Sequence, residues 1–160
     1  MTVAGAPAEG QGRLVPIGRW GTPPKRSMSA ASRRYERWVR QSFGGGPSNL
    51  EYVVRHPDGK DIWFDGVDGD TLLEAKGHYA CFVDQRIEDW HAWYRWSAGS
   101  GLRALIGQAR RQMEAARGLP VRWLCAESVV ADLLGDEFRA SPALSGRVSA
   151  EFAPMPGWDP

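Results

Sequence analysis

The sequence predicts an α/β fold in which a mixed central sheet is flanked by helices. Two observations predict it. Stretches with helical apolar periodicity and stretches typical of strands alternate along the 160 residues, in the order α-β-β-β-α-β-α-β. Hydrophobic residues make up 42% of the chain and charged residues 24%, a composition typical of a folded domain with a packed core.

The first expected element is a helix that follows an N-terminal segment without a regular pattern. Residues 1–28 contain prolines and glycines among basic residues, so we expect a linker or flexible arm there. Ser29 or Ser32 can cap the helix AASRRYERWVRQSF. The glycine run at 44–46 then ends this helix.

Three strand-like runs follow the helix. They lie at residues 50–55, 61–65 and 71–76. The pair Asp68-Gly69, between the second and third runs, is typical of a two-residue hairpin turn. We therefore expect a hairpin of these two runs, with its turn centred on that pair.

The second half of the chain predicts two longer helices, each followed by a strand. Residues 101–118 carry apolar side chains at helical spacing and lead into a strand at 121–126. Ser128 can cap the next helix, at 129–140, and residues 147–153 form the last expected strand.

These elements define one expected domain over residues 29–153. The arm at 1–28 precedes this domain, and a short tail at 154–160 follows it.

An aromatic segment separates the expected hairpin from the second helix. Trp90, Trp93 and Trp96 recur at helical spacing, which favours a place in the core or a surface for a partner protein. The alternative is that these rings stack on nucleic-acid bases while Arg86 and Arg95 contact the backbone.

The net charge of +1 hides a strong asymmetry. Residues 1–45 carry eight Lys and Arg against two Glu, and residues 46–90 carry ten Asp and Glu against four basic residues. An acidic centre beside basic segments suits a metal-dependent enzyme of nucleic acids, because carboxylates hold a cation and arginines contact phosphates. An ordinary mixed surface is the alternative.

Asp65, Glu74 and Lys76 are the main candidates for chemistry. Glu74 and Lys76 lie two apart on one strand and project from the same face. In the expected hairpin Asp65 lies opposite Leu72 and shares this face, near enough to Glu74 to share an ion. Two carboxylates beside an amine suit Mg²⁺-dependent hydrolysis of phosphodiesters. The alternative is that the aspartates only form turns and that the Glu–Lys pair is solvated.

The motifs around these residues resemble a known family. FDGVDG followed by LLEAKG, after an N-terminal helix and before QARRQ and LPVRWLCAE, resembles the restriction-endonuclease-fold toxin domains of bacterial polymorphic toxins, specifically the Tox-REase-5 family. The resemblance covers about residues 29–153. It implies membership of the PD-(D/E)xK nuclease superfamily, whose core is αβββαβ.

The resemblance also implies roles for particular residues. The metal-binding aspartate of the family falls on Asp65, its acidic signature residue on Glu74 and its catalytic lysine on Lys76, and the Ala75 carbonyl completes the ligand set. An acid from the first helix, which the superfamily often adds, falls on Glu36. The implied cofactor is Mg²⁺, with Mn²⁺ as a substitute.

Three further residues are candidates for contacts with the substrate. Gln112 resembles a polar helix position that faces the site in such nucleases. Arg111 can contact phosphates, and His78 follows Lys76 closely enough to reach the mouth of the site. An ordinary surface or packing role is the alternative for each of the three.

The function that the resemblance implies is Mg²⁺-dependent cleavage of nucleic acid, DNA rather than RNA, by the toxic module of an interbacterial effector. A cognate immunity protein is the implied partner. No apolar run approaches the roughly 20 residues of a membrane-spanning helix, so we expect no membrane insertion. The first ten residues lack the pattern of a secretory signal peptide. We expect synthesis in the cytoplasm and delivery by a specialised secretion system into the cytoplasm of a target cell.

Two other classes of function stay open. A phage or DNA-repair nuclease, or an RNA-cutting toxin of the same fold, would carry the same carboxylates. A non-catalytic binding module would use the tryptophan-rich segment instead. The presence of Asp65, Glu74 and Lys76 together argues against the binding module.

Overall fold

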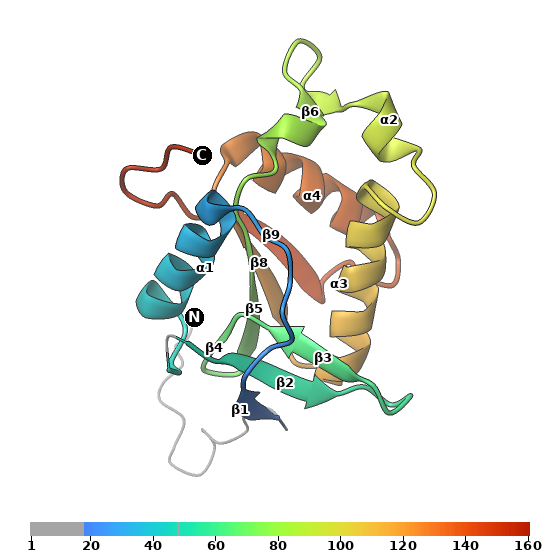
Figure 1. The fold of residues 1–160 in the computed structure, drawn as a ribbon. Coiled ribbons are helices and arrows are strands. Elements are labelled where there is room, and N and C mark those ends of the chain that lie inside the picture. The colour runs from blue at the N-terminus through green and yellow to red at the C-terminus, as the bar shows by residue number, and fades with distance from the viewer. Residues whose placement is uncertain (1–17, 48) are drawn as a thin grey trace, which may run out of the picture.

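The computed structural model describes residues 18–47 and 49–160, and Figure 1 shows its ribbon. The strands are β1 (Arg19–Gly21), β2 (Glu51–Arg55), β3 (Asp61–Phe64), β4 (Gly66–Asp68), β5 (Thr71–Lys76), β6 (Val83–Asp84), β7 (Asp89–Trp90), β8 (Val121–Cys125) and β9 (Val148–Phe152). The helices are α1 (Ala30–Ser42), the 3₁₀ turn η1 (Ala80–Phe82), α2 (Ala92–Arg95), α3 (Leu102–Ala116) and α4 (Ser128–Ala140).

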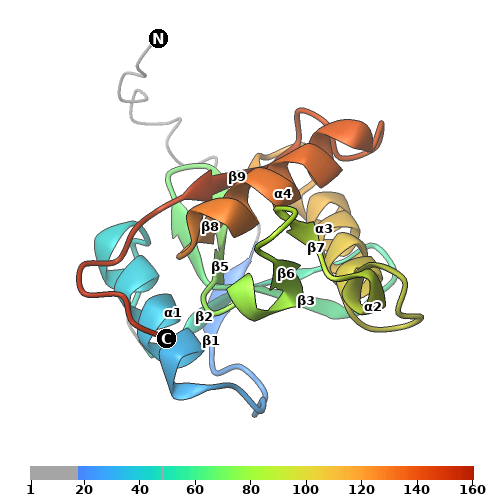
Figure 2. The ribbon, with the colours of Figure 1, turned by 90° about the horizontal axis from the view of Figure 1, so that it is seen from above.

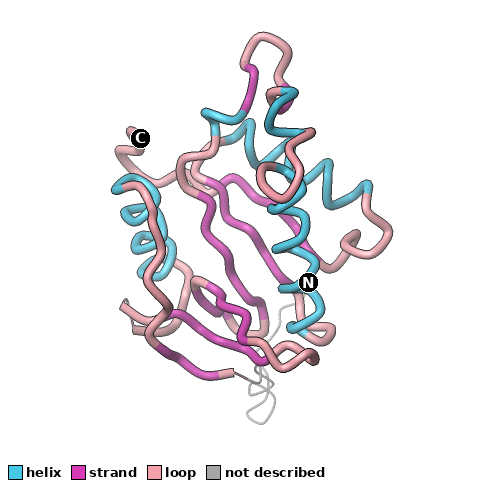
Figure 3. The backbone as a smooth tube through the Cα atoms, turned by 45° about the vertical axis from the view of Figure 1, so that its right-hand side comes forward, coloured by secondary structure: helices cyan, strands magenta, loops and turns pink. Residues whose placement is uncertain are grey.

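The centre of the fold is a mixed sheet in the strand order β4-β5-β8-β9. β5, β8 and β9 are parallel, and β4 is antiparallel to β5. A second sheet, β1-β2-β3, is antiparallel, and β6 pairs with β7. The central strands lie between α1 and α3 (Figure 3), and α4 lies along β8 and β9 (Figure 2). This arrangement confirms the expected α/β architecture.

α1 is fixed at its start and along one face. The Ser29 hydroxyl accepts the N–H of Ser32 at 3.1 Å, which identifies Ser29 as the cap. Tyr35 and Val39 are fully buried in one apolar cluster with side chains of β5 and β8. Because these two residues anchor the helix on the sheet, Glu36 lines the cavity described below.

β5 is the strand that carries the main candidate residues. All of its residues, from Thr71 to Lys76, are buried. β4 and β8 pair with its two edges, and α1 packs against it. A strand this deep in the fold can include Glu74 and Lys76 only if both charges have partners, because burying an unpaired charge is costly.

The hairpin of β4 and β5 differs in register from the expected one. Val67 pairs with Leu72, so the expected pairing of Asp65 with Leu72 is wrong. The turn is centred one residue later than expected, with Gly69 at its first central position. Gly69 has a φ of 64°, in the left-handed region that glycine adopts easily, as the first central residue of a type II′ turn requires.

The segments at both ends of the expected domain pack on it. Within the expected arm, β1 pairs with β2, and Trp20 packs edge-on against Tyr52 with ring centroids 5.1 Å apart; residues 1–17 lie outside the described part of the chain. In the expected tail, Trp158 packs against Tyr35 of α1, with centroids 5.5 Å apart. Among the described residues, no helix combines the length and the apolar character that crossing a membrane requires.

α4 begins at Ser128, with Glu127 rather than Ser128 in the cap position. The expected capping role of Ser128 is therefore wrong. The Glu127 carboxylate instead accepts the backbone N–H groups of Tyr79 and Ala80, each at 2.8 Å. These bonds tie the start of α4 to the segment that follows β5.

The aromatic segment divides into buried and exposed rings. Trp90 and Tyr94 belong to the core, and the expectation of core packing is confirmed for Trp90. Trp93 and Trp96 are 61% and 67% exposed. α2 is a single short turn of helix, so it buries only one side of this segment.

Candidate active site

A cavity of about 770 Å³ brings the candidate residues together. Its walls come from α1, the start of β2, β3, β5, α3 and the segments that precede α1 and follow β5. All eight residues that the sequence predicted for the metal site, catalysis or substrate contact at the site line this one cavity: Glu36, Asp65, Glu74, Ala75, Lys76, His78, Arg111 and Gln112. The arginines and tryptophans of the aromatic segment, at 86, 90, 93, 95 and 96, do not line it.

A β-bulge places Asp65 in the cavity. Its amide donates to the Leu73 carbonyl at 2.9 Å while Gly66 pairs with the same residue, so two residues oppose one. Such a bulge bends the strand and redirects a side chain. The Asp65 carboxylate accepts the N–H of Ala75 at 2.7 Å and is buried. The bulge therefore brings Asp65 beside Glu74 although the expected pairing is wrong.

Glu74 and Lys76 form a buried ion pair, with Nζ 2.9 Å from a carboxylate oxygen. Two glutamines of α3 hold this pair. Gln108 donates to Glu74 at 2.8 Å and accepts from Lys76 at 2.8 Å, and Gln112 donates to the other Glu74 oxygen at 2.9 Å. The indole of Trp123 donates to Gln112 at 2.8 Å. Every polar group in this network is thus oriented by a partner.

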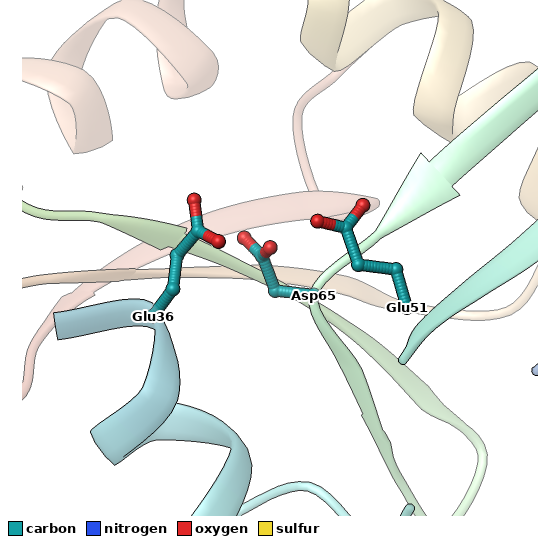
Figure 4. Close-up of side chains that lie close together, drawn as sticks. All are labelled: Glu36, Glu51 and Asp65. Carbon is teal, nitrogen blue, oxygen red and sulfur yellow. The ribbon is translucent and has the colours of Figure 1, made fainter. Parts of the chain in front are cut away.

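A cluster of three carboxylates lies next to the ion pair. Glu36 of α1, Glu51 of β2 and Asp65 each offer an oxygen, and these oxygens lie within 4.8 Å of one another. Figure 4 shows the three side chains converging from α1, from the start of β2 and from the bend between β3 and β4. We call Glu36, Glu51 and Asp65 the acidic cluster.

Glu51 is the member of the acidic cluster that the sequence analysis did not single out. It opens the run EYVV at the start of β2 and is only 3% exposed. An acid that begins an otherwise apolar strand is the signal that could have found it, because a buried carboxylate needs a cation or hydrogen-bond donors. Gln108 is a second residue of the site that the sequence analysis did not single out. Nothing in the sequence distinguishes it from a solvated glutamine on a helix surface.

Two arginines face the acidic cluster. Arg40 of α1 reaches all three carboxylates, with distances of 3.1 Å to Glu36, 3.2 Å to Glu51 and 3.5 Å to Asp65. Arg26 contacts both oxygens of Glu51, at 3.2 and 3.0 Å. The position between the carboxylates therefore already favours positive charge.

The carboxylates nevertheless outnumber the cations. Burial raises the pKa of Glu36 to about 7, and the charges of Glu74 and Glu51 add to this although Arg40 opposes it. Burial, followed by the charges of Glu74 and Glu36, raises the pKa of Asp65 well above its usual value. Burial also raises the pKa of Glu51, against the effect of Arg26. A further cation would relieve this repulsion.

The pKa of Lys76 is shifted in the direction that keeps it charged. Burial is the largest single effect and lowers it, but the neighbouring groups, led by Glu74, together outweigh burial and raise the pKa of Lys76 above its usual value. The ammonium group also lies 4.5 Å from the centroid of the Trp123 ring. Lys76 is therefore a cation that its partners hold in place in the cavity.

The other two candidates lie nearer the edge of the site. Arg111 donates to Asp58 at 3.0 Å, in a pair that is partly exposed on both sides. His78 lies with Nδ1 3.6 Å from a carboxylate oxygen of Glu127. Neither residue contacts the acidic cluster.

Residues 32–128 match the family described as restriction endonuclease fold toxin 5, which is more than half of the chain. The chain belongs to this family. The match runs from α1 to the start of α4 and includes the acidic cluster, Lys76 and both glutamines of α3. It confirms the expected family and the restriction-endonuclease-like fold, and it makes the chain a toxin with a nuclease fold. No curated protein matches the chain in sequence.

The acidic cluster fits a divalent metal ion in its chemistry. Carboxylate oxygens are the ligands that Mg²⁺ and Mn²⁺ prefer, and the cluster supplies three of them from three elements. Glu74, expected as a ligand, lies beside the cluster with both oxygens bonded to glutamines. Ala75 lines the same cavity.

Proposed function

We propose that this domain is a Mg²⁺-dependent endonuclease that cuts DNA as the toxic module of an interbacterial effector. The observation that carries the proposal is the acidic cluster in the same cavity as the Glu74–Lys76 pair. Carboxylates that gather a divalent cation, beside a fixed ammonium group, are what hydrolysis of a phosphodiester requires.

Asp65, with Glu36 and Glu51, would hold the ion, and Glu74 and the Ala75 carbonyl lie next to it as further candidate ligands. A bound Mg²⁺ supplies a Lewis acid that lowers the pKa of a coordinated water and offsets negative charge on the phosphate.

Lys76 acts on the phosphate or on the attacking water in this proposal. Its ammonium group is held by Glu74 at 2.9 Å and by Gln108 at 2.8 Å. A donor fixed in advance stabilises charge that develops on the phosphate without having to reorganise. Gln108 and Gln112 position this pair, because they hold both oxygens of Glu74.

An arginine at the edge of the cavity supplies affinity for the nucleic-acid backbone. Arg111 lines the cavity and is partly exposed. Contacts of this kind with phosphates are independent of sequence and weaken as the salt concentration rises.

The proposal also covers how the toxin domain reaches a target cell and how the producing cell is protected from it. The toxin family supports delivery to a target cell. The proposed route is a specialised secretion system that transfers the domain into the cytoplasm of that cell. A producing cell must neutralise a nuclease that it makes, so a cognate immunity protein is the proposed partner.

Cleavage by the purified chain tests the proposed function. Supercoiled plasmid DNA and a structured RNA are each incubated with the protein in Mg²⁺, in Mn²⁺ and in EDTA. We expect nicking and then linearisation of the plasmid with either metal and no cleavage in EDTA. Cleavage of RNA alone would reassign the substrate, and cleavage that persists in EDTA would exclude the metal-dependent mechanism.

A further inference from the structure

A chain of aromatic rings leads from Lys76 to the protein surface. The ammonium group of Lys76 lies 5.5 Å from the centroid of the Tyr79 ring. Tyr79 lies edge-on to Phe82 at 5.6 Å, and Phe82 lies edge-on to Trp93 at 6.0 Å. We call Tyr79, Phe82 and Trp93 the aromatic track.

The outer end of the track is a fixed and exposed ring. Trp93 is 61% exposed, yet it contacts Phe82, His91 and Tyr94 at centroid distances of 6.0, 5.7 and 5.8 Å. An exposed indole that is already held in place loses little conformational freedom when a flat ligand stacks on it. The ring is therefore a prepared surface for stacking.

The backbone of the track is fixed as well. The Glu127 carboxylate accepts the N–H groups of Tyr79 and Ala80, each at 2.8 Å. The carbonyl of Phe82 accepts the N–H of His91 at 2.9 Å, which joins the segment of Phe82 to the start of α2. In Figure 2 the segment of η1 and β6 lies beside α2.

The track is continuous with the candidate active site. Tyr79 and Phe82 line the same cavity as Lys76 and the acidic cluster. A phosphate held at Lys76 would therefore have its neighbouring bases beside these rings. Two of the three acids of this segment, Asp84 and Asp89, do not oppose a nucleic acid, because they are paired with Arg86 at 2.8 Å and with Arg95 at 2.9 Å. The third, Glu88, is exposed.

We propose that the aromatic track binds unpaired bases next to the scissile phosphate, so that the enzyme prefers single-stranded DNA to duplex DNA. The reason is geometric: rings stack on the faces of bases, and a duplex hides those faces in its own stack. This inference rests on the proposed nuclease function and adds its substrate class.

Variants of two exposed tryptophans test the inference. Trp93→Ala removes the outer ring of the track, and Trp93→Phe keeps an aromatic face. Trp96→Ala is the matched control, because Trp96 is 67% exposed and, among the described residues, has no ring contact with the track. Thermal unfolding checks that each variant is folded.

Two readouts are compared for each variant. The first is kcat/KM in Mg²⁺ for a labelled single strand without self-complementarity and for the duplex of the same sequence. The second is binding of the same two probes by fluorescence anisotropy, with Ca²⁺ in place of Mg²⁺.

We expect the wild-type protein to cut and bind the single strand better than the duplex. Trp93→Ala should lower both single-strand values about tenfold, mainly through KM, because stacking contributes about that much per base. Trp93→Phe should restore most of the loss, and Trp96→Ala should resemble the wild type.

Two results would overturn the inference while leaving the nuclease intact. One is that Trp93→Ala cleaves both probes with the same kcat/KM as the wild type, which would assign the exposed rings to a protein partner. The other is an equal loss in Trp93→Ala and Trp96→Ala. A wild-type protein that cuts no nucleic acid in Mg²⁺ would instead overturn the proposed function itself.

Discussion

At the scale of single residues, the cavity depends on how three buried carboxylates and one partly buried carboxylate are kept together. Glu74 is paired with Lys76, and Glu51 with Arg26 and Arg40. Fewer positive charges lie next to Glu36 and Asp65, and burial and the neighbouring acids raise the pKa values of both. The negative charge that remains is the property that attracts a divalent cation, so changes to these residues should alter metal affinity first.

Glu51→Gln should weaken the binding of Mg²⁺ because it removes one charged ligand from the acidic cluster. We expect the Mg²⁺ concentration for half-maximal cleavage to rise by about tenfold or more, with a smaller change in the rate at saturating metal. Calorimetric titration with Mg²⁺ checks binding without activity. Glu88→Gln, at an exposed position outside the cavity, is the control. An unchanged affinity in Glu51→Gln would remove Glu51 from the metal site.

The stability of the metal-free protein should fall as the pH rises from about 4.5 to about 7. Glu36 has a pKa of about 7 in the folded protein against 4.5 for an unperturbed glutamate, so in this window the folded state binds the proton more tightly. The free energy of unfolding therefore decreases with pH and levels off above about 7.

Urea unfolding in EDTA at several pH values measures this slope. Glu36→Gln should flatten it, since the variant has no carboxyl group to titrate at that position. Asp65 shifts in the same direction and would leave part of the slope in place. A wild-type curve that rises over the window would contradict the account of the acidic cluster.

At the scale of elements, the helices and strands with a regular apolar pattern could be predicted from the sequence, and the register of the hairpin could not. The cap and the buried face of α1 lie at the residues that the spacing of apolar residues in the sequence predicts. The hairpin register depends instead on which residue adopts a positive φ, and Gly69 does so at the first central position rather than the second. The bulge at Asp65 then carries this side chain into the site.

The aromatic segment shows a similar limit. Trp90, Trp93 and Trp96 have equal spacing in the sequence, yet the first is buried and the other two are exposed. The difference arises because α2 spans only Ala92–Arg95 and Trp90 belongs to the ribbon with β6. Spacing of three predicts one face of a helix only where the helix extends over the whole segment.

α3 offers a test in which stability and activity should change in opposite directions. Gly107 lies in the interior of α3 on the cavity wall, and a Cβ there would meet no atom within 4 Å. Gly107→Ala should stabilise the protein by roughly 0.5–1 kcal/mol, because glycine is a poor helix former. The added methyl group enters the cavity, so kcat/KM should fall by roughly tenfold.

Gly135→Ala in α4 is the matched control for that experiment. Gly135 is also inside a helix and lies outside the cavity, and the atoms nearest to its Cβ, at 3.2–3.6 Å, belong to the guanidinium group at the end of the Arg139 side chain. Thermal unfolding and cleavage are measured for both variants. Equal activity in the two variants would show that the substrate does not approach α3 at Gly107.

At the scale of the whole molecule, the basic and acidic segments of the sequence fold onto each other. Arg26 and Arg40 from the basic N-terminal part pair with Glu51 and Asp65 from the acidic part. The sequence predicted the two segments but not their pairing, because the contact depends on how α1 crosses β2 and β5. Part of the positive charge therefore lies at the acidic cluster rather than on a surface for phosphates.

The rate of plasmid nicking in saturating Mg²⁺ by Lys76→Ala tests the central claim, that this cavity is a nuclease site, most directly. Lys60→Ala, at an exposed lysine outside the cavity, is the control. We expect a loss of about 10²–10³-fold in Lys76→Ala, the cost of removing one preorganised charged donor, with Lys60→Ala at the wild-type rate. A folded Lys76→Ala protein that nicks the plasmid as fast as Lys60→Ala would contradict the claim.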